Sequence, residues 1–239
     1  MEVRLPRVAG SETSVAVRET LEAMDDAQRY NAWLYERARP FLGNLVLDVG
    51  AGTGAFTERL LADGRTVVAL EPDPDLAASL RERLAGDAAL TVVQAEAAER
   101  QDGRFDTAIC FNVLEHVHRD TEALNTIRSA LAPGGRLLLL VPAHPALYGN
   151  IDRALGHERR YRRDDLRRLL EHTGYEVEAV RLVNPIGALG WFVSSRVLGR
   201  DRIPKGPLRF YDALVPVLRI VEAIPLPFGL SLWAVARAA

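Results

Sequence analysis

The sequence has very little cysteine, no long uncharged apolar run and almost no net charge. Its one cysteine, Cys110, can form neither a disulfide framework nor a cysteine-based metal centre within a chain. No run of about 18 uncharged apolar residues occurs, so no stable membrane insertion is predicted. A formal net charge of −2 argues against a general nucleic-acid binder. These absences favour a protein of the reducing cytoplasm.

What the sequence does contain is a regular alternation of buried-strand and helical patterns. Apolar residues make up 48% of the 239 residues, which is ample for the core of one α/β domain with additions. The continuous apolar run at 136–142 implies helices on both faces of a sheet. The expected strands are 46–49, 66–70, 90–94, 105–111, 136–142, 175–183 and 230–235.

The stretch 46–55 joins the first of these strands to three glycines at alternate positions, Gly50, Gly52 and Gly54. Helical periodicity resumes at 56–62. Glycine tolerates positive φ and lets a ligand approach bare backbone, and the N-terminus of the following helix would face that ligand. The pattern therefore predicts a strand, a tight loop and a helix that bind a small molecule.

This loop is compatible with two kinds of cofactor. Gly50, Gly52 and Ala55 satisfy the dinucleotide fingerprint G-x-G-x-x-G/A, and Glu71 stands about 20 residues on, where the ribose-binding acid belongs. On the loop alone, an NAD-dependent oxidoreductase stays open.

The complete run around Asp48 resembles the first motif of the class I S-adenosylmethionine-dependent methyltransferases, hydrophobic-hydrophobic-Asp-hydrophobic-Gly-x-Gly-x-Gly. Two later segments, 114–117 (Leu-Glu-His-Val) and 133–135 (Pro-Gly-Gly), also resemble this family and would not be expected in an NAD-dependent dehydrogenase. The resemblance spans 46–183. It implies a Rossmann-like α/β fold, with helices on both faces of a seven-stranded, mostly parallel sheet of order 3-2-1-4-5-7-6.

The resemblance also implies S-adenosyl-L-methionine as the cofactor and assigns residues to it. Glu71 would accept hydrogen bonds from the ribose hydroxyls, Glu96 from the adenine amino group, and Asn112 would face the methionine part. At Glu96 the sequence departs from the family's usual Gly-Asp-Ala. The predicted cofactor-binding residues are Tyr30, Trp33, Asp48, Gly50, Ala51, Gly52, Thr53, Gly54, Glu71, Pro72, Glu96, Ala97, Asn112 and Val113.

The segment after the fifth strand is expected at the mouth of the pocket, because open parallel sheets bind ligands at the carboxyl ends of their strands. It carries groups able to take a proton or to orient a hydroxyl or amine, although spacing identifies no partner for any of them. No metal-ligating cluster is evident, so no metal site is predicted. The candidate catalytic residues are His116, His144, Tyr148, His157 and Tyr161, and a structural role stays open for each.

Two regions lie outside this common pattern. Residues 1–42 are predicted to form an N-terminal helical lid over the domain 43–239. An insertion at about 185–229 separates the sixth and seventh strands, with helices expected at 186–198 and 208–224. Three explanations stay open for the apolar face of the second helix: it packs on the core, forms a homodimer contact or lines a hydrophobic acceptor channel.

We therefore predict an enzyme that transfers a methyl group from S-adenosylmethionine to a small, natural-product-like acceptor by in-line displacement. Three alternatives stay open: an enzyme of this fold that binds S-adenosylmethionine but catalyses another reaction, such as cyclisation, an NAD-dependent oxidoreductase, and a non-enzymatic interaction role through the apolar insertion. The intact Asp48, Glu71 and loop glycines weigh against the last of these. The sequence leaves the acceptor atom undetermined, whether oxygen, nitrogen or carbon.

Overall fold

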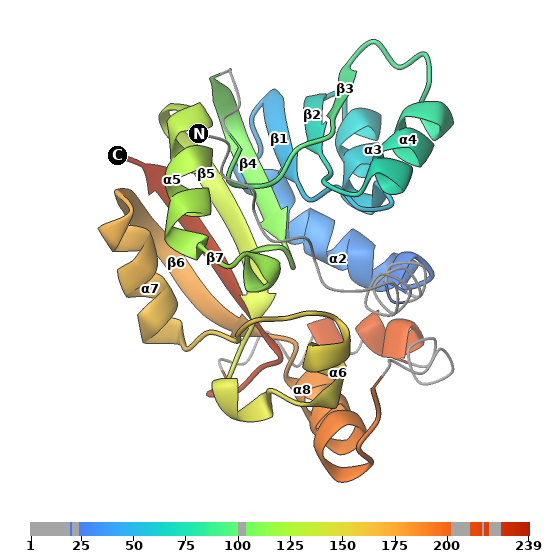
Figure 1. Ribbon diagram of the computed structural model, residues 1–239, viewed down its shortest axis with the longest axis vertical. Coiled ribbons are helices and arrows are strands. Elements are labelled where there is room, and N and C mark those ends of the chain that lie inside the picture. The colour runs from blue at the N-terminus through green and yellow to red at the C-terminus, as the bar shows by residue number, and fades with distance from the viewer. Residues whose placement is uncertain (1–19, 21–23, 100–103, 202–210, 217, 220–225) are drawn as a thin grey trace, which may run out of the picture.

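The strands form one seven-stranded sheet with the order β3-β2-β1-β4-β5-β7-β6 (Figure 1). Neighbouring strands are parallel, except that β7 runs antiparallel to both β5 and β6. This is the predicted order, so the predicted fold class is confirmed. The strands are β1 (Leu45–Val49), β2 (Thr66–Leu70), β3 (Leu90–Val93), β4 (Phe105–Phe111), β5 (Leu131–Pro142), β6 (Tyr175–Val183) and β7 (Ser231–Ala238).

Helices and short helical turns connect the strands. The computed structural model describes residues 20, 24–99, 104–201, 211–216, 218–219 and 226–239. The helices are α2 (Gln28–Ala38), α3 (Ala55–Ala62), α4 (Pro74–Arg83), α5 (Asp120–Ala130), α6 (Asn150–Ala154), α7 (Arg163–His172) and α8 (Pro185–Trp191). The shorter turns are η1 (Arg39–Phe41), η2 (Leu114–His116), η3 (Pro145–Leu147) and the π-helical η4 (Phe192–Val197).

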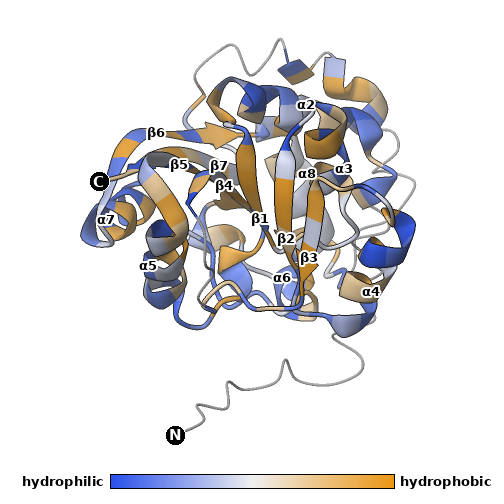
Figure 2. Ribbon diagram, turned by 90° about the horizontal axis from the view of Figure 1, so that it is seen from above, coloured by the Kyte–Doolittle hydropathy of each residue, from blue (hydrophilic) through white to orange (hydrophobic). Residues whose placement is uncertain are grey.

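Successive side chains of the central strands enter two cores, one on each face of the sheet. In β1, Leu47 and Val49 join one core and Val46 joins the other. α5 and α7 cover the first core, whereas α2, α3, α4 and the described helical residues 211–216 and 218–219 cover the second. The apolar strands therefore lie between helical layers whose outer sides are hydrophilic (Figure 2). This arrangement follows from the alternation of side chains along a strand that is buried on both faces.

The N-terminal helical region is divided, although its periodicity predicts one continuous helix. The described part has a break at Asp26 and Ala27, and α2 begins at Gln28. The buried Asn31 side chain stabilises the corner, because its Nδ2 donates a hydrogen bond to the Met24 carbonyl at 2.8 Å. The earlier part of the predicted helix lies outside the described residues, except Thr20.

β5 begins earlier than predicted. The Pro-Gly-Gly segment was expected to separate a helix from a strand starting at Arg136, but Leu131 already pairs with Phe105. The next pair joins Arg136 to Thr107, so the residues between form a bulge on β5. Gly134 has a φ of 77°, which suits glycine, and so the bend lies within the strand.

The insertion begins as predicted after β6 but is less regular than its periodicity suggests. α8 passes directly into η4, and together they cover the predicted helix 186–198. In the second predicted helix, the described residues 211–216 and 218–219 are helical, with Val215 and Leu218 buried in the core beside α2. Phe210, Val217, Val221 and Ile224 lie outside the described residues. None of the described helices has both the length and the apolarity that crossing a membrane requires.

A core substitution tests the two-sided packing of the sheet. Leu139 is fully buried in β5 between Cys110 of β4 and Ala234 of β7. We expect Leu139→Ala to lower the free energy of unfolding by about 2–5 kcal/mol, because it removes apolar contacts and leaves a cavity. Chemical denaturation measures the change. Leu189→Ala is the control, since Leu189 is 61% exposed on α8; equal losses in the two variants would contradict the packing.

Candidate functional site

The carboxyl ends of β1, β2 and β4 meet at the glycine loop. All three loop glycines adopt positive φ, at 73° for Gly50, 56° for Gly52 and 89° for Gly54. The amides of Gly50 and Ala51 both donate to the Leu70 carbonyl at 2.9 Å, which ties the loop to the end of β2. A Cβ atom on Gly50 would lie 2.4 Å from Val113 Cγ2, so a larger residue does not fit there. The loop leads into α3, whose first turn follows Gly54.

Glu71 lies against this loop at the end of β2. Its side chain is buried, and its two oxygens accept different backbone hydrogen bonds. Oε2 accepts from the Gly52 amide at 2.7 Å and Oε1 from the Asp73 amide at 2.9 Å. Burial raises the pKa of Glu71, although both amide donors oppose the shift. The carboxylate is thereby fixed beside the loop with lone pairs left for further donors.

Asp48 is the second buried acid of this region. Its Oδ2 accepts a hydrogen bond from the Thr57 hydroxyl of α3 at 2.6 Å, which joins β1 to the helix after the loop. Burial, opposed by the Thr57 hydrogen bond and assisted by the nearby Glu71 charge, raises the pKa of Asp48 to about 6. Asp48 therefore links the strand before the glycine loop to the helix after it.

The other predicted cofactor residues occupy different surroundings. Asn112 is exposed at the end of β4 with a φ of 54°, and its amide donates to the Leu140 carbonyl at 2.8 Å. Thr53 donates its hydroxyl hydrogen to Asp25 at 2.7 Å, so the loop contacts the N-terminal region. Pro72 and Glu96 are exposed and Ala97 is half-buried. Tyr30 and Trp33 are buried in the core and contact each other edge to face at 5.7 Å.

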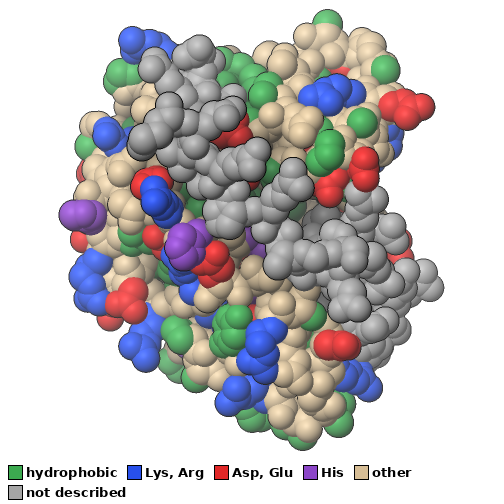
Figure 3. All heavy atoms as spheres, viewed as in Figure 1, with side chains coloured by type: hydrophobic (Ala, Val, Ile, Leu, Met, Phe, Trp, Pro, Cys, Tyr) green, Lys and Arg blue, Asp and Glu red, His purple; other side chains and the backbone are tan. Residues whose placement is uncertain are grey.

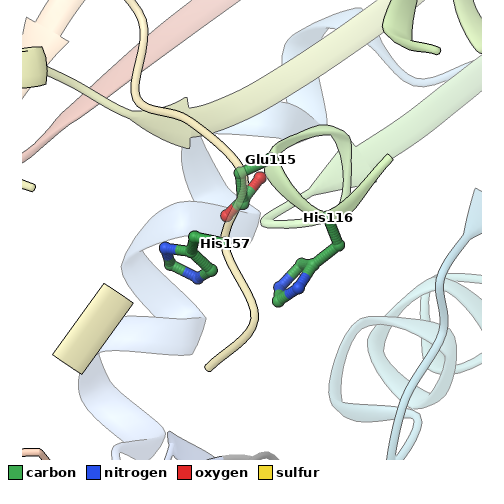
Figure 4. Close-up of side chains that lie close together, drawn as sticks. All are labelled: Glu115, His116 and His157. Carbon is green, nitrogen blue, oxygen red and sulfur yellow. The ribbon is translucent and has the colours of Figure 1, made fainter. Parts of the chain in front are cut away.

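A second group of side chains forms where β4 and β5 end. The segment after β5 returns to the sheet, because the Tyr161 amide donates to the Pro142 carbonyl at 2.9 Å and the Glu158 amide to the Glu115 carbonyl at 2.8 Å. The return brings the His157 ring 4.7 Å from the His116 ring, with the planes at 84°. Glu115 lies between them (Figure 4). Figure 3 shows histidines reaching the surface of this face beside acidic and basic side chains.

Asp152 orients His157. The carboxylate is fully buried, and its Oδ1 lies 2.9 Å from His157 Nδ1 and 2.7 Å from Arg160 Nε. Oδ2 accepts the Gly149 amide at 2.9 Å. Burial alone would raise the pKa of Asp152, but the His157 and Arg160 interactions outweigh it and lower the pKa. As an acceptor at Nδ1, Asp152 favours the tautomer with Nδ1 protonated, which leaves the Nε2 lone pair free.

Glu115 differs from Asp152 because its carboxylate lacks hydrogen-bond partners among the described residues. The side chain is 1% exposed, and neither carboxylate oxygen has a hydrogen-bond partner in the part of the chain that the structure describes. Burial raises the pKa of Glu115 to about 8, with the Arg160 charge acting in the opposite direction. His116 is exposed, and desolvation by the surrounding protein together with the neighbouring His157 lowers its pKa to about 4.

The remaining candidate catalytic residues surround this group. Tyr148 donates its hydroxyl hydrogen to the His157 carbonyl at 2.7 Å. Tyr161 is buried, and its hydroxyl lies 3.3 Å from the Leu114 carbonyl and 3.2 Å from Asp120 Oδ2. His144 has a φ of 57°, and its buried Nε2 has no hydrogen-bond partner among the described residues. The structure thus unites His116 with His157 and gives both tyrosine hydroxyls structural hydrogen bonds.

Sequence reasoning missed the polar groups that hold this arrangement. Asp152 was not recognised, although it precedes His157 by five positions. Arg160 lies in the arginine-rich stretch 159–163, a pattern typical of a solvated surface, but it is buried, donates to the Ala143 carbonyl at 3.1 Å and stacks 4.6 Å from the Trp191 ring.

The sheet order and the glycine loop define a Rossmann-like α/β fold. The model of the methyltransferase domain family matches residues 19–180, more than half of the chain. The chain belongs to this family.

Individual relatives share smaller parts. A ubiquinone biosynthesis O-methyltransferase of Xanthomonas euvesicatoria is 38% identical over 102 residues, 41% of this chain and 42% of that protein. A probable ribosomal RNA small subunit methyltransferase A of Haloarcula marismortui is 51% identical over 57 residues, 23% of this chain and 20% of that protein. The chain therefore spans less than half the length of these curated relatives.

A solved structure shows the same fold over nearly the whole chain. The 1,6-didemethyltoxoflavin-N1-methyltransferase of Burkholderia thailandensis superposes with a TM-score of 0.57 at 20% identity. The match covers 99% of this chain and 93% of that protein, which was solved with 1,6-didemethyltoxoflavin and S-adenosylhomocysteine bound.

The raised pKa of Asp48 predicts a pH-dependent stability. The folded state binds this proton more tightly than the unfolded chain, whose pKa is near 3.8, so the contribution is complete below about pH 4 and is lost as the pH rises through about 6. A shift of this size corresponds to about 3 kcal/mol. Asp48→Asn can still accept the Thr57 hydrogen bond but does not titrate. We therefore expect this variant to lack the fall in folding stability between about pH 4 and pH 6.

Denaturation midpoints recorded at pH 4 and pH 7 measure this effect. Asp87→Asn serves as the control, because Asp87 is exposed after α4. A fall in stability that is the same in wild type and Asp48→Asn would show that the Asp48 proton is not its source.

Proposed function

We propose that this protein transfers a methyl group from S-adenosyl-L-methionine to a small-molecule acceptor. The observation that carries the proposal is the position of two groups at one edge of the sheet: the Gly50–Gly54 loop with buried Glu71, and the Glu115, His116 and His157 side chains. The first group suits a nucleoside cofactor, and the second suits an acceptor that must be oriented and deprotonated. Membership of the methyltransferase domain family supports the same reaction.

The cofactor would lie across the glycine loop. Glu71 is held by the amides of Gly52 and Asp73, and its remaining lone pairs can accept both ribose hydroxyls. Asn112 and Val113 border the loop at the end of β4, on the side nearer the acceptor group. Tyr30 and Trp33 would contribute from the N-terminal side through the lid, although their present contacts are core contacts.

The chemistry needs few catalytic groups. The sulfonium carries its own leaving group, so an acceptor lone pair attacks the methyl carbon while the carbon–sulfur bond breaks and S-adenosylhomocysteine leaves. The protein must align the acceptor and remove its proton where it carries one. The His116 and His157 pair is the group best placed for that task, since His157 is oriented by Asp152.

We also propose an N-terminal lid, a homodimer contact through the insertion and a cytoplasmic location. The Thr53–Asp25 hydrogen bond supports residues 1–42 as a lid over the domain 43–239, because it joins that segment to the loop. Exposed apolar side chains on α8 and η4 support a homodimer through the 185–229 insertion; they include Leu189, Phe192 and Val197. Burial of the single thiol, Cys110, accords with a cytoplasmic enzyme.

Two other reactions compete with methyl transfer. An NAD-dependent oxidoreductase would use the same glycine loop, and a methyltransferase-like enzyme could bind S-adenosylmethionine yet catalyse a cyclisation. Family membership argues against the first. The second differs from our proposal in its product, since it would leave the methyl group on the cofactor.

Calorimetric titration with S-adenosylmethionine, S-adenosylhomocysteine and NAD in parallel tests the cofactor. We expect both sulfur compounds to bind and NAD not to bind. Binding of NAD alone would overturn the proposal.

Removal of the ribose-binding acid should weaken this binding. We expect Glu71→Ala to reduce the binding free energy of S-adenosylmethionine by about 1–3 kcal/mol, because hydrogen bonds to a charged acceptor are lost. Glu82→Ala removes an exposed acid of α4 and is the matched control. Unchanged affinity in a folded Glu71→Ala protein would show that the ribose binds elsewhere.

A further inference from the structure

Glu115, His116 and His157 form a compact set of metal-ligating side chains. One ligand atom from each lies within 4.8 Å of the others. Two of the residues come from η2 and the third from the loop after α6, and Figure 4 shows the three side chains converging. Chain segments far apart in the sequence therefore place one carboxylate and two imidazoles around a common point.

Glu115 is a buried carboxyl group that can take up a cation in place of a proton. A buried carboxylate is normally paired or receives several hydrogen bonds, because desolvation of an isolated charge is costly. Both Glu115 oxygens lack a hydrogen-bond partner among the described residues. The nearby Arg160 gives its Nε donor to Asp152 and its Nη1 donor to the Ala143 carbonyl. A cation beside Glu115 would satisfy this carboxylate directly.

His157 is already arranged as a metal-binding histidine. Its Nδ1 faces the Asp152 carboxylate at 2.9 Å, and Asp152 is itself held by Arg160 and the Gly149 amide. A carboxylate on the far nitrogen fixes the ring and its tautomer and raises the basicity of the ligand nitrogen, as is usual around protein-bound zinc. His157 Nε2 is the atom left to bind the ion.

His116 leaves the group accessible from outside. Its side chain is exposed, whereas Glu115 is buried and His157 is half-buried. Zinc ligands lie about 2.0–2.2 Å from the ion, so the three ligand atoms must move closer together when the ion binds. The exposed His116 side chain can make this small movement. Three protein ligands with solvent access leave a fourth position open, the pattern of catalytic rather than structural zinc sites.

We propose that Glu115, His116 and His157 bind one divalent transition-metal ion, with Zn²⁺ as the best match, and that its open position takes an acceptor hydroxyl. One oxygen and two imidazole nitrogens favour zinc over magnesium. The inference rests on the proposed function, and the acceptor class that it names is a phenol or an enol. With the ion bound, His116 and His157 would act as its ligands and not as bases, because coordination lowers the hydroxyl pKa and the proton passes to solvent. The bound oxygen then forms the bond to the methyl carbon as the carbon–sulfur bond breaks, giving a methyl ether and S-adenosylhomocysteine.

Direct metal binding tests the site without any acceptor. The full chain, freed of metal with a chelator, is titrated with Zn²⁺ and separately with Mg²⁺ by calorimetry, and bound zinc is counted after dialysis. We expect one equivalent of Zn²⁺ and no measurable Mg²⁺ binding. No zinc binding, or Mg²⁺ binding in preference to Zn²⁺, would overturn the proposal.

Variants then locate the ion. We expect Glu115→Gln, His116→Asn and His157→Asn each to weaken Zn²⁺ binding by more than about tenfold, because even an outer-shell partner of a zinc ligand contributes that much. His118→Asn is the matched control, since this exposed histidine lies close in sequence but pairs with Glu158. Loss of binding in His118→Asn alone would assign the ion to the surface pair and contradict the proposal.

Two further measurements keep the outcomes separate. Circular dichroism verifies that each variant is folded, and the exposed His116 provides a variant that leaves the core untouched. S-adenosylhomocysteine binding is measured on the same samples. Cofactor binding without zinc binding would refute the metal site and leave the proposed function standing, whereas zinc binding without cofactor binding would refute the proposed function.

Discussion

The burial of three carboxylates beside the carboxyl ends of neighbouring parallel strands is the constraint on which the rest of this structure depends. Asp48, Glu71 and Glu115 follow or end β1, β2 and β4, and burial raises the pKa of each. Buried charge opposes folding, so the large apolar cores on both faces of the sheet must offset its cost. A sheet that needed only stability would place apolar residues there. The acids therefore mark the edge of the sheet where ligands are expected.

The three acids are supported in different ways, which separates the edge into two parts. Glu71 receives two backbone amides and Asp48 a hydroxyl, so the part near the glycine loop is largely satisfied within the protein. Glu115 receives no such donors among the described residues and instead faces two histidines. Under the proposed function, the first part would receive the ribose, a neutral sugar that donates hydrogen bonds. The second part is prepared for a cation or for a group that exchanges protons, and the reaction would take place between them.

The sheet could be predicted from the sequence because its strands are short apolar runs separated by strong turn signals, and because the order of motifs resembles one family. The loop glycines and Glu71 were predictable for a related reason: each lies within a few residues of a strand end, so local spacing places it. The Glu115, His116 and His157 group was not predictable as a group. His157 reaches it because the loop after α6 returns to the sheet, through the bridge of Ala143 with Tyr161 and the Glu158 amide that donates to the Glu115 carbonyl, and the spacing of residues in the sequence does not reveal these contacts. The bulge in β5 is not predictable either, because Pro and Gly after a helical pattern indicate the end of a helix and not a bend within a strand.

A crystal structure of the protein with S-adenosylhomocysteine tests the central claim most directly. The account predicts that the ribose hydroxyls lie within hydrogen-bonding distance of Glu71, that the nucleoside crosses the Gly50–Gly54 loop and that the sulfur atom faces His116 and His157. A nucleoside bound away from this loop, or a sulfur atom directed away from the two histidines, would contradict it.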